Sequence, residues 1–294
     1  MRVGDLVSNP NSGARDIADV MRQDPSLTAK VLRLVNSSYY SIPGGVTDVA
    51  RAISFIGFNT LHQLVLSVSV FQALKTPSGA RLDGRGLWAH SLATAIFAEV
   101  LAARAGNRDA ASCFTAGLLH DIGKMALAIT EPTRFGQAVE LSRTENQRMN
   151  VSEVAVGLPS HERVGMRLAR KWKFPVSLHT AIERHHDASD PKVRSDLAAP
   201  LLQMLDIVSL ANDLSHRFGL GDSGTPLNDY VTEEQFARLG LSIRNLDEIQ
   251  IRMQYKMERS QVFMDLIQGR DSGGTDEFAK GATSTKVDRP RDGS

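Results

Sequence analysis

The stretch AGLLHDIGKMAL, residues 116–127, decides how the rest of the sequence is interpreted, because it places polar residues inside an apolar helical run. His120 and Asp121 are adjacent, and Gly123 and Lys124 follow directly. Burying an unpaired carboxylate among apolar side chains is costly, so Asp121 needs a partner inside the protein. The stretch therefore indicates either a metal site or a buried polar network that keeps the residues of one.

Apolar residues along the rest of the chain recur at helical spacing, and alternating β-branched runs bounded by turn residues are missing. In DPSLTAKVLRLVNSSYY, residues 24–40, Asp24 is expected to cap a helix that has Pro25 at its first position. One face of this helix carries an apolar stripe, made by Leu27, Val31, Leu34 and Val35. We therefore predict an all-α fold.

Composition divides the chain into regions. The segment KTPSGARLDGRG, residues 75–86, combines proline, three glycines and charges, which is typical of a linker. From Gly269 onward large apolar residues are nearly absent, so this end cannot bury enough surface to offset its chain entropy. We expect an N-terminal helical lobe, a linker, a second helical lobe, C-terminal helices and a disordered tail, at residues 1–75, 76–85, 86–218, 219–268 and 269–294. The C-terminal helices include a capping box at Thr232 and Gln235 and a last helix around residues 245–268.

Charge and cysteine content restrict the class of protein. Thirty-four Lys+Arg balance thirty-three Asp+Glu, so no excess charge points to a nucleic acid polymer or an anionic membrane as partner. The N-terminus has no apolar signal region, and we expect no apolar stretch near the ~18 residues that span a bilayer. A single cysteine, Cys113, suits a reducing compartment. These features predict a cytoplasmic protein.

Histidines supply most of the chemistry that the sequence offers. His90, His120, His161, His185 and His186 lie on four predicted helices, with Asp121 beside the second of them. Imidazole nitrogens together with a carboxylate suit Mn, Fe, Zn or Mg. Helical spacing places His185 on the apolar face of its helix and His186 on the polar face. The remaining three, His62, His179 and His216, are expected to be ordinary core or surface residues.

Several of these segments carry a family resemblance. HSLATA, LLHDIGK, SHERVGMRLARKW and AIERHH resemble the signature of the HD superfamily of metal-dependent phosphohydrolases, and in particular its signalling version, the HDOD domain. Upstream, IADVMRQDPSLTAKVLRLVNSSYY and VTDVARAISFIGFNTLHQLVLSVSV are similar to the helical N-terminal lobe of HDOD proteins. The resemblance covers nearly all of residues 10–218. It implies two helical lobes, the second an HD-like bundle, that act in signal transduction.

The resemblance also implies a ligand set. Matched motif by motif, the metal ligands of the catalytic relatives fall on His90, His120, Asp121, His161, His185 and His186. Lys124 falls where it could contact a substrate phosphate. The chain begins almost directly at the first HDOD helix, so we expect either that an upstream element of that lobe is missing or that its start is misassigned.

Two departures weaken the match to the catalytic relatives. Their later aspartate is replaced, because the apolar stripe of Leu201, Leu205 and Val208 aims Asn212 at the site. An amide oxygen is a poorer ligand than a carboxylate, since it brings no negative charge. The glycine, tyrosine, proline loop of the phosphodiesterases is also absent from HHDASDPKVRSD, residues 185–196.

Two function classes stay open. The first is a non-enzymatic signalling module that binds a protein partner or a nucleotide second messenger through a helical groove, requires no cofactor and keeps the His/Asp cluster as a vestigial site. The second is a metal-dependent phosphohydrolase that acts on a cyclic dinucleotide or a nucleotide phosphoester, with Lys124 on the phosphate. We expect the first, because Asn212 and the missing loop both weaken hydrolysis. A helical scaffold without a ligand is a third interpretation.

Overall fold

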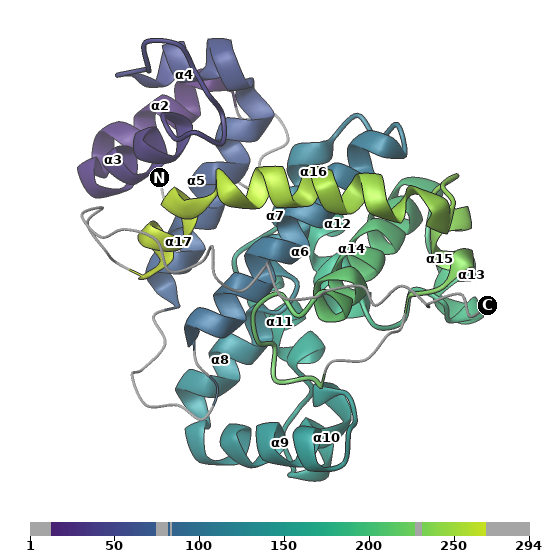
Figure 1. Cartoon of the computed structure of the whole chain (residues 1–294). Helices are drawn as coiled ribbons and strands as arrows, with labels where there is room; N and C mark the ends of the chain where they lie inside the picture. Colours follow the sequence, from purple (N-terminus) through teal and green to yellow (C-terminus); the bar gives the residue numbers. More distant parts are fainter. Residues whose placement is uncertain (1–12, 75–81, 83, 227–230, 269–294) are drawn as a thin grey trace, which may run out of the picture.

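The computed structural model describes residues 13–74, 82, 84–226 and 231–268, and every regular element in these ranges is a helix (Figure 1). The predicted all-α fold is therefore confirmed. The predicted disordered tail, residues 269–294, lies outside the described residues, and so does most of the predicted linker.

The N-terminal region begins with short amphipathic helices. As predicted, the Asp24 carboxylate caps one of them by accepting the amide hydrogen of Leu27 at 2.9 Å, and the predicted apolar stripe is buried. Gly57 separates two others with φ +80°, a conformation that favours glycine. The described helices of this region are α2 (Ala14–Gln23), α3 (Pro25–Val35), α4 (Val49–Ile56) and α5 (Phe58–Ala73).

The second region is built around one long helix, α6, which packs against α7 and α14. It begins at Gly84, two residues inside the predicted linker. The helices of this region are α6 (Gly84–Arg104), α7 (Ala110–Leu119), α8 (Ile122–Thr130), α9 (Pro132–Thr144), α10 (Met149–Ala155), α11 (His161–Lys171), α12 (Val176–Arg184), α13 (Pro191–Asp196) and α14 (Ala199–Arg217).

Helix α6 corrects one expectation from the sequence. It is 21 residues long and contains an 18-residue window with a mean hydropathy of 1.3, so by length and composition it could cross a membrane. The expectation that no stretch approaches this length was wrong. In the folded protein 83% of this apolar window is buried, because neighbouring helices surround it. A helix that is apolar all round belongs in the core of a large globular protein, and α6 has that place here.

The C-terminal helices return across the molecule. The predicted capping box is present, since Gln235 N–H donates to the Thr232 hydroxyl and Thr232 N–H donates to the Gln235 side chain. The last helix, predicted as continuous, is interrupted at Arg259 and Ser260, where the Ser260 hydroxyl donates to the Met257 carbonyl and competes with helical bonding. The elements are α15 (Glu233–Arg238), the 3₁₀ helix η1 (Ile243–Asn245), α16 (Leu246–Glu258) and α17 (Gln261–Gln268).

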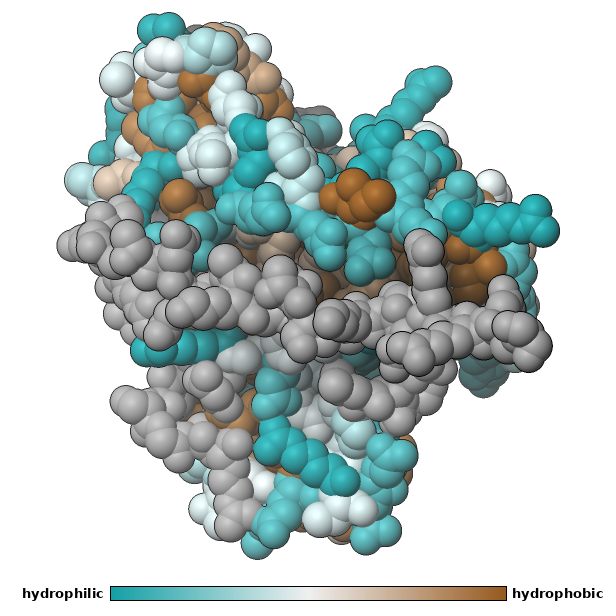
Figure 2. Space-filling model, viewed as in Figure 1, coloured by the Kyte–Doolittle hydropathy of each residue, from teal (hydrophilic) through white to brown (hydrophobic). Residues whose placement is uncertain are grey.

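The N-terminal and second regions are joined by packing and by a polar contact. Helix α5 packs on α7, and α16 and α17 run over α6 toward α3 (Figure 1). Lys256 of α16 donates to Glu99 of α6 at 2.8 Å, and the hydroxyl of Tyr39, after α3, donates to the same carboxylate. On the face shown in Figure 2, hydrophilic side chains predominate over α16 and hydrophobic ones form small patches. The C-terminal helices therefore hold the two regions together.

Candidate metal centre

Two glycines determine how the site assembles. A Cβ atom on Gly123 would lie 1.9 Å from the His161 carbonyl oxygen, and a Cβ on Gly165 would lie 2.6 Å from the Ile182 side chain. The two residues also face each other where α8 crosses α11. Only glycine permits so close an approach, and the approach brings His161, at the start of α11, to Asp121, at the start of α8.

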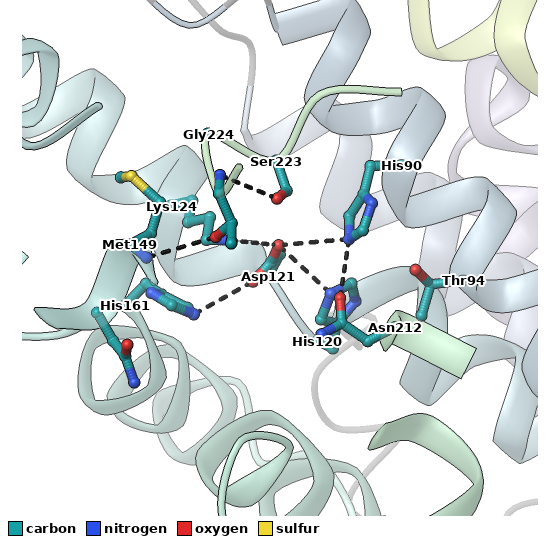
Figure 3. Close-up of polar contacts among 12 residues, drawn as sticks. His90, Thr94, His120, Asp121, Lys124, Met149, His161, Asn212, Ser223 and Gly224 are labelled. Carbon is teal, nitrogen blue, oxygen red and sulfur yellow. Dashed lines mark hydrogen bonds and ion pairs between the residues drawn. The ribbon is translucent and has the colours of Figure 1, made fainter. Parts of the chain in front are cut away.

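Asp121 lies at the centre of the cluster, and its two carboxylate oxygens face different histidines (Figure 3). Oδ2 lies 3.3 Å from Nε2 of His120 and 3.9 Å from Nε2 of His90, while Oδ1 lies 3.3 Å from Nε2 of His161 and 3.7 Å from Nε2 of His185. All five side chains are at most 1% exposed. The structure thus brings together residues of α6, the α7–α8 junction, α11 and the end of α12.

The partner that the buried Asp121 carboxylate requires is Lys124. Its ammonium donates to Oδ2 at 2.8 Å, and its side chain is 1% exposed. The resemblance placed Lys124 on a substrate phosphate, whereas here it forms a buried ion pair three residues along the chain. A lysine so placed neutralises the carboxylate from within the fold.

Three histidines present a bare Nε2 atom to this centre. Nδ1 of His120 donates to the Gly117 carbonyl at 2.6 Å, and Nδ1 of His185 donates to the Ile182 carbonyl at 3.0 Å. Nδ1 of His161 lies 2.9 Å from a carboxylate oxygen of Glu153. A neutral imidazole that donates from Nδ1 has its lone pair on Nε2, and these Nε2 atoms have no hydrogen-bond partner. Anchored Nδ1 atoms and free Nε2 atoms are the usual state of metal-binding histidines.

The opposite edge of the cluster is already satisfied by the protein. Nε2 of His90 lies 2.9 Å from Oδ1 of Asn212, on α14. Asn212 therefore points into the site, as the stripe on its helix predicted. The adjacent Asp213 points elsewhere and accepts from the Gln235 side chain at 2.7 Å, so it does not replace the missing carboxylate.

An outer layer of acidic residues was missed by the sequence analysis. Glu153 of α10 is fully buried, holds both the ring and the backbone amide of His161, and keeps a second oxygen, Oε1, without a partner. Glu162 lies beside it and accepts from Asn150. The signal for Glu162 was its place next to His161, but α10 is too short to show a periodic face that would have singled out Glu153.

His186 belongs to this outer layer. Its Nδ1 lies 3.2 Å from the Arg148 guanidinium, which can only donate, so the neutral ring carries its hydrogen on Nε2. That Nε2 lies 4.0 Å from Glu162. The structure therefore brings His186 close to the centre, beside His185, but in the tautomer that does not suit ligation through Nε2.

The sequence match that decides the family covers residues 1–188, more than half of the chain, and it is to the HDOD domain. The chain belongs to the HDOD family. An uncharacterised protein of Treponema pallidum is 26% identical over 182 residues, which are 62% of this HDOD chain and 35% of that relative. The chain thus spans about a third of the length of that curated relative.

Solved structures agree with the HDOD assignment. An HDOD domain protein of unknown function from Geobacter sulfurreducens is 25% identical, with a TM-score of 0.68 over 90% of this chain and 89% of the other. A protein from Marinobacter aquaeolei, provisionally named for signal transduction, is 24% identical, with a TM-score of 0.72 over 91% of this chain and 58% of the other. The likeness to the Marinobacter aquaeolei protein shows that the two chains share a fold.

Burial sets the protonation of the HDOD cluster. Burial, and after it the nearby His120, lowers the pKa of His90 and of His185 to about 3. For Asp121 burial alone would raise the pKa, but His120 and Lys124 outweigh it and hold the pKa well below the usual range. Burial would also lower the pKa of His161, yet the Glu153 carboxylate raises it. At neutral pH the cluster thus contains an ionised Asp121 facing neutral His90 and His185 rings.

One further histidine adjoins the cluster on the His90 side. His216 was expected to be an ordinary core or surface residue; it is buried, and its ring lies 4.6 Å from that of His90. Both line a cavity of about 270 Å³ whose other wall is the segment 219–226. Gly221 lies against α6 so closely that a Cβ would be 2.1 Å from the His90 backbone nitrogen. The remaining two histidines lie apart from the centre, His62 stacked on Phe58 and His179 half-buried on α12.

Proposed function

We propose that this HDOD chain is a cytoplasmic signalling module that works by binding a partner and does not hydrolyse a phosphoester. The observation that carries the proposal is the state of Asp121. Its carboxylate, which a hydrolase would use to hold metal, already forms a buried ion pair with Lys124 at 2.8 Å. The lysine that a hydrolase would offer to a phosphate is thereby also engaged.

The cluster nevertheless fits a divalent metal ion. Asp121, His120, His161 and His185 offer one carboxylate and three bare imidazole nitrogens, a donor set that suits Zn, Mn or Fe. Buried polar atoms without partners are rare in folded proteins, and each of these four residues has one. When bound, an ion supplies positive charge that links the helices carrying these residues. We assign it a structural or regulatory part in the module.

Two further observations support binding without turnover. Asn212 stands opposite His90 where the catalytic relatives have a carboxylate, so the cluster has less negative charge with which to hold and activate a first ion. The side chains of the cluster are at most 3% exposed, which leaves them closed to substrate.

We expect a protein partner in preference to a nucleotide, because the cavity beside His90 is small. The cavity beside His90 has a volume of about 270 Å³, below the roughly 300–1,000 Å³ of pockets that enclose drug-sized ligands. Arg143, the cation at its edge, is paired with Asp222 at 2.6 Å and is not available for a phosphate. The signal-transduction name of the Marinobacter aquaeolei structure agrees with this proposal.

The first prediction tests hydrolysis directly. Purified protein is supplied with Mn²⁺ or Mg²⁺ and assayed against cyclic dinucleotides, nucleoside phosphates and bis-p-nitrophenyl phosphate. We expect product formation indistinguishable from buffer, because Asp121 and Lys124 are engaged with each other and the site is closed.

Asp121→Asn serves as the matched variant, since it keeps the side-chain shape and removes the charge. Turnover by the unmodified protein that disappears in Asp121→Asn, with the circular dichroism spectrum unchanged, would establish the alternative function, a metal-dependent phosphohydrolase. The observation that supports the phosphohydrolase function is the set of Nε2 atoms without hydrogen-bond partners around Asp121.

A further inference from the structure

The two oxygens of the Asp121 carboxylate divide the cluster into halves that differ in charge. We call His90, which faces Oδ2, and its partner Asn212 the amide half, and we call His161 and His185, which face Oδ1, the histidine half. In Figure 3 His161 lies on one side of Asp121, and His90 and Asn212 lie on the other. His120 stands between the halves, with its ring centroid 5.4 Å from that of His90 and 5.0 Å from that of His185.

The amide half has no donor atoms left for an ion. Asn212 Oδ1 can only accept a hydrogen bond, so His90, at 2.9 Å, must donate from Nε2, and that nitrogen then has no lone pair to offer. Oδ2 of Asp121 accepts from the Lys124 ammonium at 2.8 Å, which supplies the positive charge the oxygen needs. A divalent cation on this half would meet a neutral amide, a protonated nitrogen and a nearby lysine.

The histidine half has the opposite character. Oδ1 of Asp121 has no hydrogen-bond partner, and neither has Nε2 of His161 or of His185. The Oδ1–Nε2 distances are 3.3 and 3.7 Å. Ligands of one tetrahedral ion with ~2.0–2.2 Å bonds lie roughly 3.3–3.6 Å apart, so Oδ1 has nearly the separation from each of the two Nε2 atoms that an ion requires.

Electrostatics favours the same half. Glu153 and Glu162 are buried next to His161, with Nδ1 of that ring 2.9 Å from Glu153 and 3.8 Å from Glu162. Each keeps one carboxylate oxygen without a partner. Two buried carboxylates behind a ligand add negative potential and raise the basicity of the ring they hold.

We propose that the chain binds a single divalent transition-metal ion in the histidine half, through Asp121 Oδ1, His161 and His185 with His120 as the adjoining ligand, and that Lys124 and Asn212 exclude a second ion. The inference rests on the proposed function in that it treats the cluster as a closed binding site. It adds the number of ions and the half of the cluster that holds them.

Metal counting tests the proposal. Protein purified without nickel affinity or chelator is saturated with Co²⁺, desalted, and analysed by mass spectrometry and by visible absorption. We expect one ion per chain with the intense visible bands of a tetrahedral Co²⁺ site. Two ions, or none, would overturn the proposal.

Variants of the two halves place the ion. His161→Gln and His185→Gln should lose stoichiometric Co²⁺, whereas His90→Gln should keep it. His179→Gln is the matched control for His185, since it lies on the same helix outside the cluster. Loss of the ion in His90→Gln with the fold intact contradicts the assignment to the histidine half. The wild-type count and spectrum decide the matter if the glutamine variants do not fold.

A gain-of-site variant tests the role of the lysine and the amide. The double variant Lys124→Met, Asn212→Asp frees Oδ2 and adds a carboxylate opposite His90, so the count should rise from one ion to two. Lys171→Met, which alters an exposed lysine on α11, should leave it at one. A count that stays at one in the double variant refutes exclusion by Lys124 and Asn212.

The hydrolysis assay separates this inference from the proposed function. One ion together with turnover would refute the non-catalytic function alone. Two ions without turnover would refute the single-ion inference alone.

Discussion

The N-terminal helices and the bundle around α6 are stabilised in different ways. In α3 the buried residues are apolar and lie on one stripe, so the helix is held by burial of hydrophobic surface against its neighbours. In the α6 bundle the core contains an ionised Asp121, a lysine and several histidines, all at most 1% exposed. The first kind of core tolerates small losses of contact, whereas the second depends on the buried Asp121 carboxylate keeping the Lys124 ammonium as its partner.

The largest expected loss of unfolding free energy comes from removing one partner of the buried Asp121–Lys124 ion pair. Asp121→Ala leaves the Lys124 ammonium buried without its carboxylate, and removal of one partner from a buried pair costs about 3–5 kcal/mol of unfolding free energy. Urea denaturation with chelator present measures the loss. The double variant Asp121→Ala, Lys124→Met should recover most of it, and a double variant as unstable as the single one would show that the ion pair is not the cause.

An apolar truncation in the other region should have a somewhat smaller effect. Leu61 of α5 is 0% exposed and belongs to the hydrophobic core. Leu61→Ala removes buried methyl groups and leaves a cavity, at a cost of about 2–5 kcal/mol. Co²⁺ binding by the folded fraction should be unchanged. Loss of the metal by a folded Leu61→Ala variant would show that the apolar core of the N-terminal region is coupled to the metal site.

Overpacking the place where α8 crosses α11 should lower the unfolding free energy less than Leu61→Ala does. It should weaken metal binding more. In Gly123→Ala the new Cβ would lie 1.9 Å from the His161 carbonyl, so α8 and α11 must separate. Such strain costs about 1–3 kcal/mol, and moving His161 from Asp121 should weaken Co²⁺ binding. Calorimetry and a Co²⁺ titration give both quantities. Gly136→Ala on α9, a helical glycine outside the cluster, is the control, and equal loss of metal in both variants would contradict the geometric reason.

The smallest effect is expected at the contact that joins the regions. Lys256 pairs with Glu99 at 2.8 Å and lies 4.6 Å from the ring centroid of Tyr39, but its side chain is 33% exposed. Partly exposed ion pairs contribute below ~1 kcal/mol, so Lys256→Met should lower the unfolding free energy only slightly. A double-mutant cycle with Glu99→Gln measures the coupling, and a value of several kcal/mol would show that the contact is as demanding as the buried cluster.

Local rules predicted the fold well. The Asp24 cap and the capping box at Thr232 depend on neighbouring residues, and both are present. Predictions failed where tertiary packing decides. Helix α6 is apolar on every face because other helices enclose it, and the break near Ser260 depends on a side chain that bonds to its own backbone.

The sequence predicted many of the residues that form the candidate site, but not the contacts that these residues make. The resemblance pointed to His90, Asp121 and His185, and the structure brings them together. The ion pair of Asp121 with Lys124 was within reach, because residues three apart on a helix are neighbours. Glu153 was not, since nothing in the sequence of a short helix eight residues before His161 indicates that it folds back onto that ring.

The contact between Tyr39 and the C-terminal helices affects how the protein folds during its synthesis. Tyr39 meets Lys256, 217 positions later, and its ring also packs on Phe263 of α17. On a ribosome that adds about 5–20 residues per second, roughly 10–40 s separate the emergence of these partners. Throughout that interval the first helices of the nascent chain leave the exit tunnel with an aromatic surface uncovered, and they reach their final packing only when the last helices have been translated.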